Sequence, residues 1–226
     1  TLNGINPSAG VSYAFAKANN LYINLATSFE TPALSELSAN PNGDRGFNEN
    51  LEAQKATNYE LGIKGQLTKV ISYQVALFHI DTQDDLVPFE LAAFPDRTFF
   101  RNAGRTVRNG IEIEGVYTIS KAWAFTAAYT FSDFTYDDFT TANGTFNGNI
   151  LPGIPQHYTN LGLQFKSEKG FYVNAQASLV GKQYANDSNQ TEVDGYENIN
   201  IRAGYNFTYK KIKILPYAGM NNILGQ

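Results

Sequence analysis

The 226-residue chain contains no cysteine, one tryptophan and one methionine. The absence of cysteine excludes a disulfide scaffold, a thiolate zinc site and a cysteine nucleophile. No apolar run approaches the roughly 18–20 residues that a membrane-spanning helix needs. The net charge of −4 offers no basic field for nucleic acid, so nucleic acid is not predicted as a partner.

Aromatic residues and glycine, by contrast, are abundant. The chain has 14 Tyr, 16 Phe and 19 Gly, which are residues of strands and turns. The mean hydropathy of −0.32 suits a soluble protein. It equally suits a membrane β-barrel, because barrel strands are apolar on only one face.

The clearest pattern lies at residues 58–67, where apolar and polar residues alternate without a break. Side chains of a strand point alternately to opposite faces, so this segment has one apolar face and one polar face. The apolar face comprises Tyr59, Leu61, Ile63, Gly65 and Leu67, and the polar face Asn58, Glu60, Gly62, Lys64 and Gln66.

The same alternation recurs along the chain and predicts about ten strands in five hairpins. The strands are expected at residues 9–16, 21–29, 51–67, 70–81, 108–119, 123–132, 158–166, 171–180, 198–207 and 212–220. Short turns alternate with long polar loops, which are expected at about 30–53, 84–99, 137–152 and 184–195. No segment of useful length has the helical period.

These patterns favour an all-β fold, an antiparallel up-and-down transmembrane β-barrel, over a soluble β-sandwich. Regular alternation of short turns and long loops is typical of a barrel with periplasmic turns and extracellular loops, whereas Greek-key connections mix the lengths. Tyr and Phe gather at strand ends, where a membrane interface accommodates them. The polar face carries charges that a water-filled or plugged lumen accommodates.

Several motifs resemble the C-terminal part of the β-barrel of TonB-dependent outer-membrane receptors. LEAQKATNYELGIK at 51–64 resembles a strand of that family entered from a long extracellular loop, and FRNAGRTVRNGIEIE at 100–114 is similar to another of its strands. LPGIPQH at 151–157 resembles a proline-rich loop exit, and NIRAGYNF at 200–207 and NNIL at 221–224 resemble the last barrel segments.

The resemblance implies a barrel of about 22 strands, preceded by a plug domain and a TonB-contacting segment. Residues 1–226 are then part of the barrel domain, with the plug, the first strands and the final strand absent. Because unpaired strand edges seek partners, we expect a curved open sheet of about ten strands, or a barrel completed by association.

The function implied by the resemblance is active transport through the outer membrane of a Gram-negative bacterium. The expected ligand is a scarce one, most simply a ferric siderophore, and the expected partners are the TonB complex, outer-membrane lipid and the iron chelate. No catalytic residue, resident metal or cofactor is predicted.

Individual side chains are assigned by face and by loop. Lumen-facing positions, in contact with a plug or water, are expected for Glu60, Lys64, Glu112, Glu114 and Arg202. Candidate ligand contacts in the extracellular mouth are Phe89, Phe94, Phe99, Arg101 and Arg108. Two alternative roles are equally compatible with the sequence: ordinary loop packing for these phenylalanines and structural ion pairing for these arginines. Arg101, Arg105 and Arg108 are spaced so that they do not share one face.

Other readings of polar residues are also open. Glu112 and Glu114 resemble a glycosidase pair, although such pairs normally come from different strands. His79 and His157 are isolated in sequence, and Asp81, Asp84 and Asp85 lack the spacing of a calcium loop. At the level of the whole protein, the alternatives are a non-transporting outer-membrane barrel used for adhesion or structure, and a soluble β-sandwich binding module.

Overall fold

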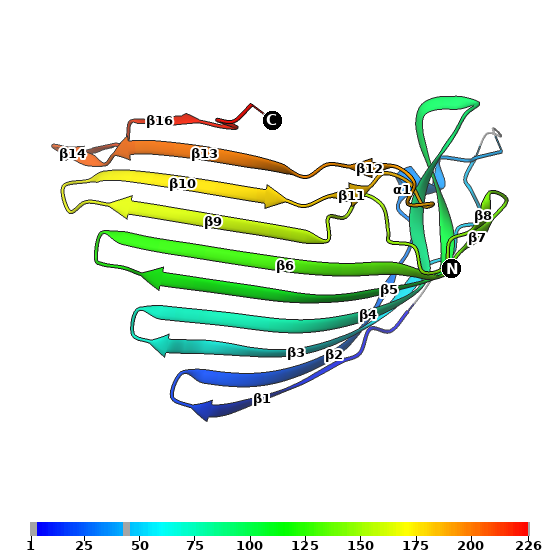
Figure 1. Ribbon diagram of the computed structural model, residues 1–226, viewed down its shortest axis with the longest axis horizontal. Coiled ribbons are helices and arrows are strands. Elements are labelled where there is room, and N and C mark those ends of the chain that lie inside the picture. Colours follow the sequence, from blue (N-terminus) through cyan, green and yellow to red (C-terminus); the bar gives the residue numbers. More distant parts are fainter. Residues whose placement is uncertain (1–3, 43–45, 226) are drawn as a thin grey trace.

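The computed structural model describes residues 4–42 and 46–225 and contains a single ten-stranded antiparallel sheet (Figure 1). Neighbours in the sheet follow chain order, as in an up-and-down wall. The strands are β1 (Ser8–Ala16), β2 (Asn19–Glu30), β3 (Gln54–Thr68), β4 (Ile71–Leu91), β5 (Phe94–Thr118), β6 (Trp123–Asp138), β9 (His157–Lys166), β10 (Phe171–Val180), β13 (Tyr196–Tyr205) and β16 (Tyr217–Met220).

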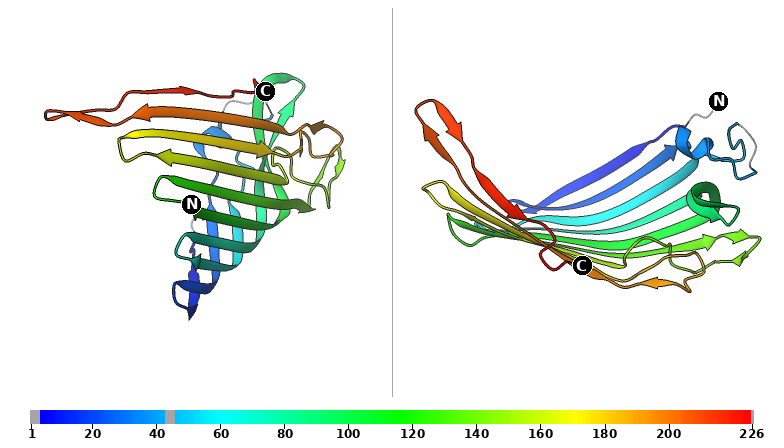
Figure 2. Two further views of the ribbon diagram at one scale, coloured as in Figure 1. Left: turned by 60° about the vertical axis from the view of Figure 1, so that its left-hand side comes forward. Right: turned by 90° about the horizontal axis from the view of Figure 1, so that it is seen from above.

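The sheet is curved and open, with β1 and β16 at its two edges (Figure 2). The expected curved open sheet of about ten strands is therefore confirmed. A β-sandwich needs two packed sheets, and the described strands of this wall form one.

Smaller elements occupy the connections. Three two-stranded ribbons pair β7 (Thr140–Thr141) with β8 (Gly144–Thr145), β11 (Gln183–Tyr184) with β12 (Glu192–Val193), and β14 (Phe207–Tyr209) with β15 (Ile212–Ile214). Helix α1 (Leu34–Leu37) lies in the first long loop, whose residues 43–45 fall outside the described part of the chain. Within the described ranges, no helix has the length and apolar character needed to cross a membrane.

Short turns and the β14–β15 ribbon lie at one end of the sheet, and the other connections lie at the opposite end (Figure 1). These two ends are called the turn end and the loop end. The β9–β10 turn needs glycine at Gly170, which adopts φ 98° and lies so close to the Asn206 carbonyl that a Cβ would overlap it. L-residues avoid this backbone region, so this short turn depends on its sequence.

The register keeps each side chain on its expected face. Leu61, Leu77, Ile111 and Phe131 form one row of paired positions across β3 to β6. The neighbouring row contains Gly62, Ala76, Glu112 and Thr130. Tyr59, Leu61 and Ile63 thus share one face, and Glu60 and Lys64 lie on the other, as predicted.

The polar face is the inner one. Its members include the buried residues Tyr22, Ala76 and Ser132, whereas Ile23, Leu61 and Leu77 on the apolar face are 40–60 % exposed. The concave side of a curved sheet is the more crowded side, which assigns the polar face to it. The outward apolar rows are called the apolar band; on β2 to β6 they comprise Leu21, Ile23, Leu25, Leu61, Ile63, Ile71, Tyr73, Val75, Leu77, Ile111, Ile113, Tyr117, Phe125, Ala127, Tyr129 and Phe131.

The prediction of a loop at residues 84–99 is wrong. β4 and β5 continue through it as a long hairpin whose tip rises beyond the other loop-end connections (Figure 1). Asp84 adopts φ 56° and interrupts the pairing between Gln83 and Asp85. β3 pairs with β4 only as far as the Lys55–Gln83 pair, so residues 84–91 of β4 pair with β5 alone. Pro88 therefore occupies an edge position, where its missing N–H costs little.

The prediction of a single strand at residues 212–220 is also wrong. It is divided into β15 and β16, which are separated by Leu215 and Pro216. Proline removes a donor from the ladder, and the carbonyl of Pro216 instead accepts a hydrogen bond from the Tyr205 amide, at 3.0 Å.

Candidate functional site

The inner face carries the five charged residues assigned to it from sequence. Glu60, Lys64, Glu112, Glu114 and Arg202 all occupy inward rows. The Lys64 ammonium lies 5.4 Å from the centroid of the Tyr22 ring, and the Arg202 guanidinium 5.0 Å from that of Tyr217. Glu112 and Glu114 lie two residues apart on β5, opposite Ala76 and Gln74 of β4 and opposite Thr130 and Ala128 of β6.

Aromatic rings on this face contact glycines of the next strand. Tyr22 covers Gly62, Phe78 covers Gly110 and Tyr172 covers Gly204, in each case so closely that a Cβ on the glycine would overlap the ring. A cross-strand aromatic ring shields the backbone that glycine leaves bare. In each pair the ring occupies the space that a side chain would fill on the neighbouring strand.

Amide side chains line a groove on the inner face of β9, β10 and β13. The groove has a volume of about 750 Å³. Amides donate and accept hydrogen bonds at once, so this wall suits water or the polar surface of another protein segment. Its polar residues are Thr126, Gln164, Asn174, Gln176, Asn198, Asn200, Arg202 and Asn221.

At the loop end, the β4–β5 hairpin carries the predicted aromatic residues. The rings of Phe89 and Phe94 each lie 5.8 Å from the ring of Phe99, measured between centroids. Phe99 is fully buried, whereas Phe94 is exposed. Phe99 therefore supports the cluster, and Phe89 and Phe94 form its accessible part.

Arg101 is enclosed by rings and paired with a loop carboxylate. Its guanidinium lies 4.6 Å from the Phe89 centroid and 5.1 Å from the Phe139 centroid. Its Nη2 lies 3.1 Å from Oδ2 of Asp187, and the Tyr136 hydroxyl donates to Oδ1 of the same carboxylate at 2.8 Å. Burial, followed by the hydrogen bond to Asp187, raises the pKa of Tyr136.

Asp187 belongs to the loop between β11 and β12, which is hydrogen-bonded to the loop between β8 and β9. The Asn149 side-chain amide donates to the Asp187 carbonyl at 2.8 Å. Asn189 bonds both the amide and the carbonyl of Ile150, at 2.7 and 2.8 Å. Nearby, Val87, Ala103, Tyr136, Phe139 and Leu151 form a buried apolar cluster. The mouth is thus a packed assembly of loops around β4–β5.

Arg108 is paired inside the wall with Asp85. The Arg108 guanidinium and the Thr106 hydroxyl both donate to Oδ2 of Asp85, each at 2.6 Å. Asp81 faces outward, on the row of Val107 and Thr135. The predicted acidic cluster is therefore split between two faces, and no group of three or more metal-ligating residues occurs in the described part of the chain.

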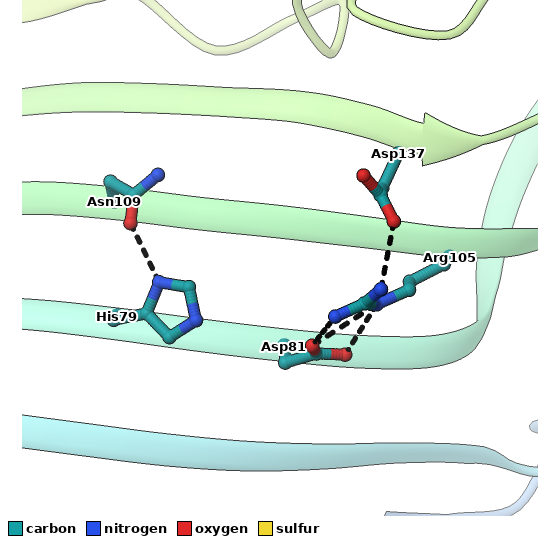
Figure 3. Close-up of polar contacts among 5 residues, drawn as sticks. All are labelled: His79, Asp81, Arg105, Asn109 and Asp137. Atoms are coloured by element: carbon teal, nitrogen blue, oxygen red, sulfur yellow. Dashed lines mark hydrogen bonds and ion pairs between the residues drawn. The ribbon is translucent and has the colours of Figure 1, made fainter.

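Arg105 points outward, so the three arginines do not share one face, as expected. Its guanidinium donates to both carboxylate oxygens of Asp81 and to Asp137 of β6 (Figure 3). The bond from Arg105 is the main cause that lowers the pKa of Asp81. His79 lies on the same face with Nδ1 2.7 Å from Oδ1 of Asn109, and His157 is bonded to Tyr129 at 2.9 Å.

Sequence reasoning missed Asp187, Tyr136, Phe139 and Asn189. Tyr136 continues the alternation of β6 by four residues beyond the predicted strand end, and that was an available signal. Asp187 and Asn189 lie in a polar loop with no local pattern. Their roles depend on contacts with residues 86 and 39 positions away in the sequence.

These features define an up-and-down antiparallel wall with an apolar exterior, a charged interior and packed loops at one end, which is the architecture of transmembrane β-barrels. Residues 1–223 match the family described as TonB dependent receptor-like, beta-barrel. The chain therefore belongs to the TonB-dependent receptor family, whose members are receptors of the Gram-negative outer membrane.

Individual relatives agree with this membership. The chain is 27 % identical over 197 residues to the ferrioxamine receptor of Yersinia enterocolitica, covering 87 % of this chain and 25 % of that protein. It is 26 % identical over 214 residues to the catecholate siderophore receptor Fiu of Escherichia coli, covering 90 % and 27 %. The chain thus spans about a quarter of the length of these relatives.

A solved structure shows the same fold. The ferric preacinetobactin receptor BauA of Acinetobacter baumannii superposes with a TM-score of 0.72 at 17 % identity, covering 98 % of this chain and 32 % of that chain.

Proposed function

We propose that this chain is part of an outer-membrane receptor that imports a ferric siderophore with energy supplied through TonB. The observation that carries the proposal is the family match along residues 1–223, together with similarity to siderophore receptors over 87–90 % of the chain. The faces of the sheet support it, because a transporter wall must meet lipid outside and a polar pathway inside.

Within such a receptor, residues 1–226 form part of the barrel domain, and the plug, the first strands and the final strand lie elsewhere in the protein. The charged inner rows and the amide groove support a role in contacting that plug. Glu60, Lys64, Glu112, Glu114 and Arg202 are then charged contacts for plug side chains or water.

We propose that the ligand binds at the loop end of the wall, on the accessible part of the aromatic cluster. Phe89 and Phe94 offer ring faces next to Arg101, and an iron chelate with flat aromatic or hydroxamate groups can pack on them. Asp187 neutralises Arg101, and Asp85 neutralises Arg108. We therefore expect the two arginines to order the mouth, and ligand contact to depend chiefly on the aromatic rings.

The decisive test is uptake by the full-length protein. Expressed in an iron-starved strain that lacks its own siderophore receptors, it should restore growth on at least one ferric chelate of a panel that also includes cobalamin and oligosaccharides. Deletion of tonB should abolish that growth. Surface expression without uptake of any panel member would favour the non-transporting barrel used for adhesion or structure.

A further inference from the structure

The outer face of the wall changes character directly above the apolar band. The row that pairs Leu61, Leu77 and Ile111 is apolar. The next outward row toward the loop end contains Tyr59, His79 and Asn109. Asp81, Arg105 and Asp137 follow it. In a barrel placed in a membrane as proposed above, side chains at this level lie among lipid headgroups.

Contacts between strands hold this outward polar layer in place. Arg105 of β5 joins Asp81 of β4 to Asp137 of β6, and His79 of β4 is bonded to Asn109 of β5 (Figure 3). Five side chains from neighbouring strands therefore present fixed polar atoms toward the surroundings of the wall.

A groove of about 910 Å³ opens on this side, over β2, β3 and β4. Its sheet side is formed by Phe29, Lys55, Tyr59, His79 and Asp81, and the segment of residues 4–7 contributes a wall. Gly4 lies so close to the Phe29 ring that a Cβ there would overlap it. The groove therefore combines aromatic rings with cationic and polar groups.

The charges within the groove are unevenly compensated. Asp81 and Asp137 both pair with Arg105 on the β5 side. On the β3 side, no carboxylate of the described residues lies within ion-pair distance of the Lys55 ammonium. Among the described residues, the Lys55 ammonium is therefore an uncompensated positive charge that can attract an anion, and the ring of His79 lines the same groove.

We propose that this groove binds the phosphate of a membrane-lipid headgroup, with the acyl chains lying on the apolar band below it. Lys55 contacts the phosphate, Tyr59 and Phe29 contact the glycerol or sugar region, and Asp81 accepts hydrogen bonds from headgroup hydroxyl or amino groups. Ile23, Leu61 and Leu77 form the next outward row and provide the apolar continuation that free phosphate cannot use.

Native mass spectrometry of the full-length protein in mild detergent tests the proposal. The probes are phosphatidic acid, the matched diacylglycerol without phosphate, and inorganic phosphate. Phosphatidic acid should remain bound, and Lys55→Gln should weaken its binding about fivefold, as expected for one interfacial charge. Lys121→Gln, which removes an exposed charge at the turn end, is the matched control and should have no such effect.

Three outcomes would overturn the proposal: equal losses in Lys55→Gln and Lys121→Gln, equal retention of diacylglycerol, or full competition by inorganic phosphate. The proposal depends on the barrel lying in a membrane and not on any chelate. Because lipid retention is measured without a siderophore, its failure is distinguishable from failure of the uptake test.

Discussion

Asp187 joins three parts of the mouth through one residue. Its carboxylate accepts from Arg101 of β5 and Tyr136 of β6, and its carbonyl accepts from Asn149. Arg101 cannot be replaced by lysine without loss, since only a planar guanidinium can stack between two rings and still reach Asp187. The loop position therefore depends on a small number of side chains.

Replacing Asp187 should loosen this loop. Asp187→Ala leaves the Tyr136 hydroxyl and the Arg101 guanidinium without their carboxylate, at a cost of about 1–3 kcal/mol to the local structure. Limited proteolysis of the full-length protein should then cut residues 185–191 faster than in the parent. Tyr136→Phe removes only one of the two bonds and should give a smaller increase; equal cleavage in all three proteins would contradict the role of Asp187.

The Asp81–Arg105 pair predicts a pH-dependent contribution to stability. Asp81 lies beyond the apolar band, and Arg105 lowers its pKa in the folded state. A carboxyl group with a lowered folded pKa stabilises the fold above its unfolded pKa, and this contribution is lost as the pH falls through the folded value. Asp81→Asn should therefore lower the urea midpoint at pH 7, and the difference from the parent should shrink as the pH falls below the unfolded pKa of about 3.9 and through the lowered folded pKa. A constant difference over this pH range would rule out this linkage.

At the scale of elements, the glycine–aromatic pairs are close contacts between neighbouring strands that leave no room for a side chain at the glycine. Gly62 is limited by the far end of the Tyr22 side chain, which can move. Gly110 is limited both by the Phe78 ring and by the carbonyl oxygen of Phe131, which belongs to the paired backbone. The two glycines should therefore respond differently to an added methyl group.

Gly62→Ala and Gly110→Ala test this difference in refolded barrels by urea titration. Each should cost about 1–3 kcal/mol, as overpacking does. Tyr22→Ala should relieve most of the cost of Gly62→Ala, whereas Phe78→Ala should not relieve Gly110→Ala. Gly115→Ala is the control, since its nearest neighbouring atom would lie 3.9 Å from the new Cβ. Equal rescue in both pairs would show that backbone crowding at Gly110 is unimportant.

The strands that sequence predicts best are those with an uninterrupted period of two. Residues 171–180 coincide with β10, and the faces of Leu61 and Lys64 are as expected. The β4–β5 hairpin was cut short because Asp84, Asp85 and Pro88 have the composition of a loop. Asp85 is held by Thr106 and Arg108, and Pro88 pairs with Phe100 of β5; no local pattern records these contacts.

At the scale of the whole molecule, the mouth is built from segments far apart in sequence. Phe89, Phe94, Phe99 and Arg101 could be assigned to one region because they lie in one stretch of chain. Their partner Asp187 could not, since its contact with Arg101 spans 86 positions. The inner charges were assigned to one face by parity alone, because a strand without a bulge fixes parity.

The outer and inner faces of the wall should differ in how well they tolerate a new charge. Ile113 lies within the apolar band, opposite Val75 and Tyr129, and the adjacent Glu112 faces inward. Ile113→Arg places a charge against lipid and should destabilise the folded barrel by about 2–4 kcal/mol, whereas Glu112→Arg should change stability by only about 0.5 kcal/mol. Urea titration in lipid vesicles and the fraction of heat-modifiable protein in outer membranes measure both effects. Tolerance of Ile113→Arg together with loss of folding in Glu112→Arg would reverse the two faces, because the charge would then meet water at 113 and lipid at 112.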